Sequence, residues 1–85
     1  MEIVLSEKAE EHIAYWKEQN NKAVQKRIIA LKNAIIVSPY SGIGKPKPLK
    51  HELTGKWSRR IDQKNRFIYY VENNTLYILS LKGHY

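Results

Sequence analysis

The sequence predicts an α+β domain in which two N-terminal helices pack on a small twisted antiparallel sheet. In the first half of the chain, apolar residues recur at the spacing of an amphipathic helix. From residue 56 onward, apolar and polar residues alternate with the period of two that is typical of half-buried strands. Residues 38–49, which are rich in glycine and proline, separate the two patterns and are expected to be irregular.

Size and composition indicate a single domain, residues 1–85. A chain of this length buries only about 60% of its unfolded surface, and 42% apolar residues suffice for one compact core. The absence of cysteine excludes a disulfide framework and a thiolate metal site. The apolar runs are far shorter than the ~20 residues that span a membrane, and the first residues lack the pattern of a signal peptide. We therefore expect a cytoplasmic protein with no membrane association.

The N-terminal half should contain a short strand and two helices. Residues 2–5 form an apolar, partly β-branched run that predicts the strand. Ser6 can cap the first helix, because its hydroxyl accepts a hydrogen bond from a free N–H group of the first turn. Asn20–Asn21 ends this helix, and the second helix should end near Val37 because Pro39 disfavours helical backbone before it. The two helices are expected to form a hairpin that covers one face of the sheet.

Three successive strands should form an antiparallel meander in the second half. The strands are predicted at residues 57–62, 66–72 and 75–81. A turn at residues 63–65 joins the first two, and Asn73–Asn74 resembles a two-residue hairpin turn that tolerates positive φ. The tail at residues 82–85 then returns toward the start of the middle strand.

The charge of the chain is segregated along the sequence. Residues 1–37 carry six Lys or Arg and five Asp or Glu, a net charge of +1, whereas residues 38–85 carry nine and three, a net charge of +6. Such a segment indicates a polyanionic partner, because a merely solubilising surface usually mixes both signs. The residues expected to contact nucleic acid are Lys45, Lys50, His51, Lys56, Arg59, Arg60 and Lys64.

A second group of residues suits the cleavage of RNA without a metal. The three histidines lack zinc-ligand spacing, so we expect no metal site and no cofactor. Arg66 opens the middle strand, and the tail that follows the antiparallel last strand brings His84 and Tyr85 toward it. Lys47 approaches from the preceding loop.

Each of these residue types has a part in such a reaction. Attack of a ribose 2′-hydroxyl on the adjacent phosphate needs a base, an acid and cations. Histidine carries protons near neutral pH, arginine binds phosphate, and tyrosine can stack on an unpaired base. Each residue also has an ordinary alternative: His84 can be merely solvated and Arg66 an edge charge. Trp57 is better explained as a core or dimer contact than as a base-stacking platform.

The stretch GIGKPKPLKHELTGKWSRRID, followed by NRFIYY and a final HY, resembles the YoeB group of toxins in the RelE/ParE superfamily. SEKAEEHIAYW in the N-terminal half conforms as well, so the resemblance extends from residue 1 to residue 85. It implies a RelE-like fold and an endoribonuclease that cuts translated mRNA in the ribosomal A site. The implied partners are a YefM- or Phd-like antitoxin, the 70S ribosome, a second copy of the chain, and operator DNA through the antitoxin complex alone.

The resemblance also implies roles for residues of this chain. Arg66 matches the family arginine that stabilises the charged phosphate, His84 the histidine proposed as general acid, and Tyr85 the terminal tyrosine that orients the substrate. The family's general base is a glutamate between the prolines of K-P-E-P-L. This chain has KPKPL there, which puts Lys47 in its place. We expect Lys47, Arg66, His84 and Tyr85 to form the catalytic site.

The lysine at position 47 leaves three interpretations open, because a protonated lysine cannot accept a proton. Neighbouring Lys45, Lys50 and Arg66 can leave a neutral fraction of Lys47 that acts as the base. Lys47 can instead only bind phosphate, and the reaction is then slow, since losing a general base costs ~10²–10⁴-fold. A replaced glutamate, natural or introduced, can also leave a silent homologue that still binds the ribosome, RNA and antitoxin. DNA binding by this chain alone is a weaker hypothesis, because the helix pair is nearly charge-balanced.

Overall fold

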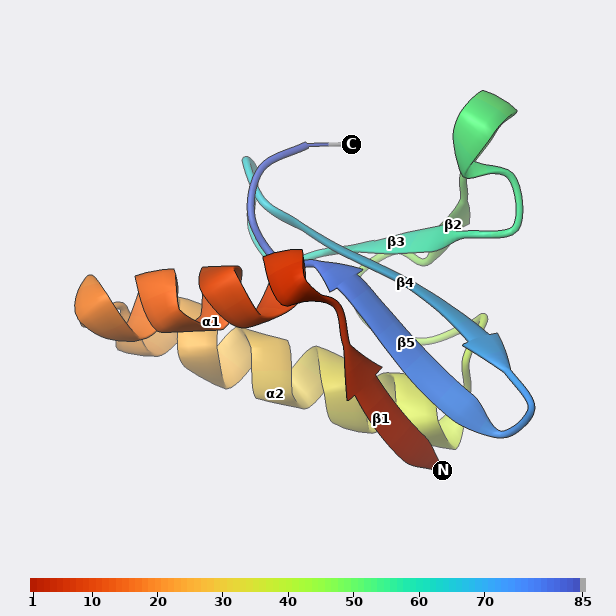
Figure 1. Ribbon diagram of the computed structural model, residues 1–85, viewed down its shortest axis with the longest axis horizontal. Helices are drawn as coiled ribbons and strands as arrows, with labels where there is room; N and C mark the ends of the chain where they lie inside the picture. Colours follow the sequence, from red (N-terminus) through yellow and green to blue (C-terminus); the bar gives the residue numbers. More distant parts are fainter. Residues whose placement is uncertain (85) are drawn as a thin grey trace.

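Within residues 1–84, the part of the chain that the structure describes, two helices and a five-stranded sheet make up the fold (Figure 1). The structure is a computed structural model. In chain order its elements are β1 (Glu2–Leu5), α1 (Glu7–Glu18), α2 (Lys22–Val37), β2 (Lys47–Pro48), the 3-10 helix η1 (His51–Leu53), β3 (Trp57–Arg60), β4 (Arg66–Glu72) and β5 (Thr75–Ser80). The predicted α+β class is confirmed.

The sheet is mixed, with the strand order β1-β5-β4-β3-β2. β3, β4 and β5 form the predicted antiparallel meander, and β2 adds a short antiparallel edge strand. β1 instead runs parallel to β5, with Val4 opposite Tyr77, so the expectation of a wholly antiparallel sheet is wrong at this edge. Parallel neighbours need a long connection, and the helices and the other strands between β1 and β5 provide it.

Both helices begin at the predicted cap residues. Ser6 Oγ accepts a hydrogen bond from the N–H of Ala9 at 3.0 Å, and Asn21 Oδ1 accepts one from that of Val24 at 3.1 Å. The Ser6 hydroxyl also donates to the carbonyl of Leu79 at 2.8 Å. The same side chain therefore starts α1 and fastens it to the end of β5. Neither helix within residues 1–84 is long and apolar enough to cross a membrane.

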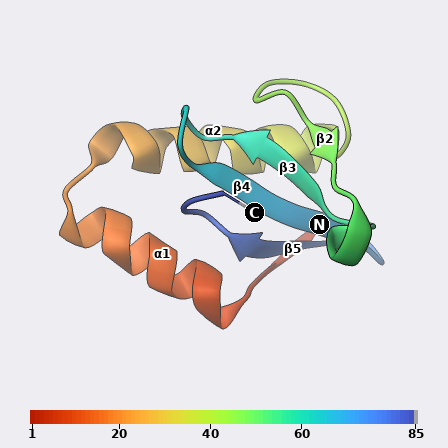
Figure 2. The same ribbon diagram turned by 90° about the horizontal axis from the view of Figure 1, so that it is seen from above.

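The helices cover one face of the sheet and leave the other face uncovered by helix (Figure 2). The core lies between the layers, and its fully buried residues are Ala9, Leu31, Ile35, Phe67, Tyr69, Leu76 and Leu81. Trp57 packs against this core and lies 4.8 Å from the Tyr40 ring, which supports its interpretation as a core residue. Because side chains alternate along a strand, the other face, here called the open face, carries Ser58, Arg60, Arg66, Ile68, Tyr70 and Tyr77.

Gly44 lies where the loop before β2 passes closest to the core. Its φ is +84°, and an added Cβ would lie 2.7 Å from Leu31 Cδ2 and 3.1 Å from Arg59 Cβ. We expect Gly44→Ala to lower the free energy of unfolding by about 2–4 kcal/mol, because it strains the backbone and overpacks the core. Gly55→Ala is the matched control, since Gly55 has φ +93° and nothing within 4 Å; it should lose about 1–2 kcal/mol. Equal losses in urea denaturation would contradict the packing argument.

Candidate functional site

A basic pocket opens on the sheet where β2, β3 and β4 meet on the open face. It has a volume of about 290 Å³ and is lined by Lys45, Pro46, Lys47, Ser58, Arg60 and Arg66. The strand register explains this grouping, because Lys47 pairs with Ser58 and Arg60 pairs with Arg66. Two predicted catalytic residues, Lys47 and Arg66, and two predicted RNA contacts, Lys45 and Arg60, therefore share one pocket.

Two residues of β3 hold the loop that precedes β2: Arg60 through its backbone and Arg59 through its side chain. The backbone N–H of Arg60 donates to the carbonyl of Gly44 at 2.7 Å. Lys45 follows with φ +51°, an uncommon value for a residue with a side chain. β2 begins directly after this bend. The two lysines are thus presented by a constrained backbone rather than by a free loop.

Arg59 holds the same loop from the core side. Its side chain is 0% exposed, and its guanidinium donates to the carbonyls of Ser38 (2.7 Å), Ser41 (2.8 Å) and Ile43 (3.0 Å). Its Nε donates to the Tyr69 hydroxyl at 3.2 Å. The expectation that Arg59 contacts RNA is therefore wrong. The alternation of side chains along β3 turns Arg59 into the core and leaves Arg60 on the open face.

The turn before β4 orients Arg66. Its Nη1 donates to the carbonyl of Asp62 at 2.8 Å, which fixes the guanidinium at the rim of the turn. Asp62 Oδ1 accepts hydrogen bonds from the backbone N–H groups of Lys64 and Asn65. Burial alone would raise the pKa of Asp62, but these bonds, those of the Asn65 side chain and the charge of Arg66 hold it below its usual value. The carboxylate of Asp62 therefore stabilises the turn by accepting these hydrogen bonds.

The C-terminal tail returns to the start of β4, as the sequence predicts. The backbone N–H of Arg66 donates to the carbonyl of Gly83 at 3.1 Å, and the N–H of Gly83 donates to Asn65 Oδ1 at 2.8 Å. These bonds place the tail beside the first residue of β4. His84, the next residue, is exposed. Tyr85, the fourth predicted catalytic residue, lies outside the described residues.

The other predicted RNA contacts surround the basic pocket without lining it. Lys50 and His51 line a neighbouring hollow of about 370 Å³ formed by β2 and η1. Lys56 Nζ lies 5.4 Å from the centre of the Tyr70 ring on the open face. Lys64 lies in the exposed turn before β4. These residues extend the positive charge beyond the pocket, toward η1 and toward the turn before β4.

Three polar residues of the open face were not among the predicted site residues. Ser58 is 4% exposed and lines the basic pocket beside Lys47. Tyr70 and Tyr77 stack across β4 and β5 with ring centres 4.6 Å apart and planes at 10°. The period of two contained the signal, because it puts Ser58 on the face of Arg60 and Tyr70 on the face of Arg66.

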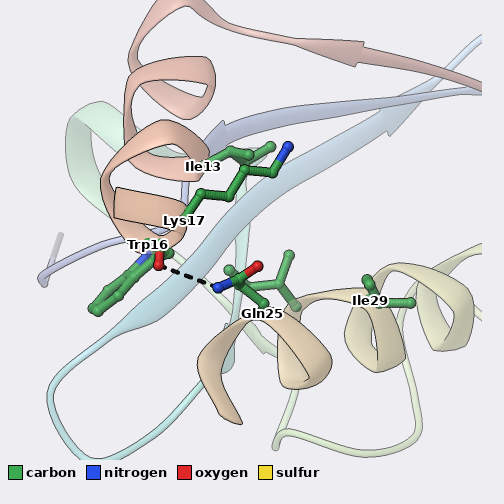
Figure 3. A pocket seen from close by; sticks show the side chains of 6 residues that line it. Ile13, Trp16, Lys17, Gln25 and Ile29 are labelled. Atoms are coloured by element: carbon green, nitrogen blue, oxygen red, sulfur yellow. Dashed lines mark hydrogen bonds between the residues drawn. The ribbon is translucent and has the colours of Figure 1, made fainter. Parts of the chain in front are cut away.

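A further hollow, of about 170 Å³, lies between α1 and α2 (Figure 3). Its lining is mainly apolar, with Ile13, Trp16 and Ile29 among the contributing residues. It lacks the convergent charged groups of the basic pocket. Among residues 1–84, no three His, Cys, Asp or Glu side chains are grouped so that they could hold a metal ion.

The basic pocket can bind a phosphodiester. Four cationic side chains surround it, and arginine in particular matches the geometry of phosphate oxygens. Among its described lining residues there is no carboxylate and no imidazole, so proton transfer requires Lys47 or the adjacent tail. The arrangement suits stabilisation of a charged phosphorane more directly than activation of a nucleophile.

Comparison with known proteins assigns the family. Residues 5–85 match the YoeB-like toxins of bacterial type II toxin-antitoxin systems. The chain belongs to this family. Toxin YoeB of Synechocystis sp. is 46% identical over 74 residues, which cover 87% of this chain and 86% of that protein. Toxin YoeB of Escherichia coli K12 is 39% identical over 85 residues, 100% of both chains.

Solved structures of YoeB toxins share the fold of this chain. The YoeB/ParE toxin from Agrobacterium tumefaciens superposes with a TM-score of 0.94 at 30% identity, covering 100% of both chains. The chain also matches a YoeB-YefM complex from Staphylococcus aureus with a TM-score of 0.90 at 42% identity, covering 100% of this chain and 98% of that one. The predicted YoeB membership and RelE-like fold are confirmed.

Proposed function

We propose that this chain is the toxin of a type II toxin-antitoxin pair and an endoribonuclease that cuts mRNA in the ribosomal A site without a metal. The basic pocket carries the proposal: Lys45, Lys47, Arg60 and Arg66 line one pocket on the open face. Membership of the YoeB-like toxins supports the same function. The +6 charge of residues 38–85 supplies the attraction to RNA and its dependence on salt.

The proposed reaction is the attack of a ribose 2′-oxygen on the adjacent phosphorus. The new O–P bond forms as the bond from phosphorus to the 5′-oxygen breaks, which leaves a 2′,3′-cyclic phosphate and a 5′-hydroxyl. Arg66 and Arg60 stabilise the charge that develops on the phosphate oxygens. His84 donates the proton that the leaving 5′-oxygen needs, and Tyr85 orients the substrate by stacking on a base.

Position 47 sets the rate in this proposal. The 2′-hydroxyl must lose a proton, and a charged lysine cannot take it, so in this chain the proton passes to solvent water, which is a weak base. We therefore propose that Lys47 acts mainly as a phosphate contact and that the natural chain cuts slowly. The second candidate function is a silent toxin homologue that binds RNA and antitoxin without cutting. The observation that favours it is the absence of a carboxylate and an imidazole among the described residues that line the basic pocket.

The relatives of the chain support two of its proposed partners, an antitoxin and a second copy of the chain. YoeB of Staphylococcus aureus occurs in a complex with YefM and as a dimer. We propose that this chain likewise binds a YefM-like antitoxin, forms a homodimer, and reaches operator DNA only through the antitoxin complex. The proposed contacts with mRNA and the 70S ribosome are Lys45, Lys50, His51, Lys56, Arg60 and Lys64.

Primer extension on a defined mRNA in a reconstituted bacterial translation reaction tests the function. We expect the natural chain to cut within the A-site codon and His84→Ala to cut roughly 10²-fold more slowly, the effect of removing a general acid. His51→Ala is the comparison variant, because His51 is also exposed but lies outside the basic pocket; as a proposed RNA contact it should weaken binding without slowing the chemical step when the toxin is in excess. Cleavage by His84→Ala at the natural rate would refute the role of His84. If neither the natural chain nor Lys47→Glu cuts, the nuclease function is refuted. If only Lys47→Glu cuts, the chain is the silent homologue.

A further inference from the structure

Leu81 joins β5 to the tail that carries His84, and α1 holds its backbone on both sides. The N–H of Leu81 donates to His12 Nδ1 at 3.0 Å, and the carbonyl of Leu81 accepts from Trp16 Nε1 at 3.0 Å. The Leu81 side chain is fully buried. Two side chains on successive turns of one helix therefore fix the point at which the tail leaves the sheet.

The next residues of the tail are held as well. Lys82 Nζ lies 4.1 Å from the centre of the Tyr15 ring of α1, and Gly83 exchanges hydrogen bonds with Asn65 and Arg66. His84 thus follows a segment that is fastened to α1 at one end and to Arg66 of the basic pocket at the other. Because only two residues separate Leu81 from His84, the contacts at Leu81 limit how far His84 can move.

Trp16 is itself fixed between the helices. Its carbonyl accepts a hydrogen bond from Gln25 Nε2 of α2 at 3.2 Å (Figure 3), and its side chain is 7% exposed. The indole N–H can only donate, and the carbonyl of Leu81 is its partner. The contact between α1 and α2 therefore holds Trp16 in place, and Trp16 in turn holds the backbone at the start of the tail.

The contact with His12 depends on its protonation state. A backbone N–H can only donate, so the Nδ1 that receives it must be unprotonated, and a doubly protonated imidazolium has no acceptor. Burial, together with the charges of Lys8 and Lys82, lowers the pKa of His12, while Glu11 opposes the shift. His12 is thus an acceptor at neutral pH and loses this capacity as the solution becomes acidic.

We propose that His12 and Trp16 are positioning residues that hold the C-terminal tail at the basic pocket, and that protonation of His12 releases the tail. Neither residue lines the pocket. The tail attachment stands on these contacts alone, whereas its consequence for RNA cleavage rests on the proposed function. A fall in pH would then slow the step that depends on His84 while the sheet remains folded.

NMR of the full chain tests the attachment without reference to activity. As pH falls from about 7.5 to about 4.5, a range that extends below the usual histidine transition because the pKa of His12 is lowered, the amide signals of Leu81 and Gly83 should shift and lose protection against exchange. His12→Asn should keep them in place throughout, because an amide oxygen can accept without titrating. His12→Leu and Trp16→Phe should loosen both amides already at neutral pH. Unshifted amides in the natural chain, or protected amides in His12→Leu, would overturn the proposal.

Cleavage rates measured over the same pH range test whether the tail attachment affects the reaction. The rate of the natural chain relative to that of His12→Asn should fall roughly 2- to 10-fold toward the acidic end, the effect of losing one hydrogen bond. The two proteins differ only at residue 12, so the ratio isolates His12. Urea denaturation at each pH shows whether the variants are folded. If the amides respond as expected and no variant cuts RNA, the attachment stands and the proposed function fails. A constant ratio would show that His12 does not control the site.

Discussion

Lys47→Glu is expected to raise the rate of RNA cleavage by about 10²–10⁴-fold, the contribution of a general base. The new carboxylate would lie opposite Ser58 and beside Lys45, Arg60 and Arg66. These cations favour its charged form, and a charged carboxylate can take the proton of the 2′-hydroxyl. The measurement is the single-turnover rate of A-site cleavage with toxin in excess over ribosomes, so that a change in RNA affinity does not mask the change in chemistry.

Lys50→Glu is the matched control for the change in charge. It alters the net charge by the same amount, and Lys50 lines the hollow beside η1 rather than the basic pocket. We expect it to weaken RNA binding without accelerating cleavage. If Lys47→Glu slows cleavage instead of raising its rate, Lys47 is itself needed for the reaction. It would then act either as a base with a neutral fraction or as an essential phosphate contact. If only Lys47→Glu cuts, the natural chain is the silent homologue.

Arg59→Met is expected to lower the free energy of unfolding by about 3–5 kcal/mol, the range for breaking a buried charged network. The substitution leaves the carbonyls of Ser38, Ser41 and Ile43 without the donor that pairs with them. A small domain has a total stability of only about 5–15 kcal/mol. Urea denaturation should therefore show a variant that is close to unfolding at physiological temperature.

Arg60→Met is the neighbouring control, because Arg60 is exposed on the open face. We expect its stability to change by less than about 0.5 kcal/mol, while its affinity for RNA falls. Arg59→Lys should resemble Arg59→Met in stability, since one ammonium group cannot reproduce the planar set of donors. Equal stability of Arg59→Met and Arg60→Met would show that Arg59 is not needed to hold the loop that precedes Lys45.

The sequence by itself determined the local structure of this protein. Ser6 and Asn21 cap the helices as predicted, because capping needs only a side-chain oxygen next to free N–H groups. Asn73 and Asn74 adopt φ values of +51° and +55° in the hairpin between β4 and β5, since asparagine tolerates this region better than most residues. The antiparallel meander followed from the period of two. The return of the tail toward Arg66 followed from strand order. Lys47 was expected only to approach from an irregular loop, and its place in β2, paired with Ser58, came from the structure.

Only the tertiary structure decided which side of the sheet became the site. Arg59 and Arg60 are adjacent and chemically identical, and the alternation along β3 says only that they face opposite ways. The packing of α1 and α2 on one face turned Arg59 into a buried structural residue and Arg60 into a lining residue of the basic pocket. The parallel pairing of β1 and the hold of His12 and Trp16 on Leu81 have the same origin. Contacts between segments this distant along the chain depend on how whole layers pack, which no local pattern encodes.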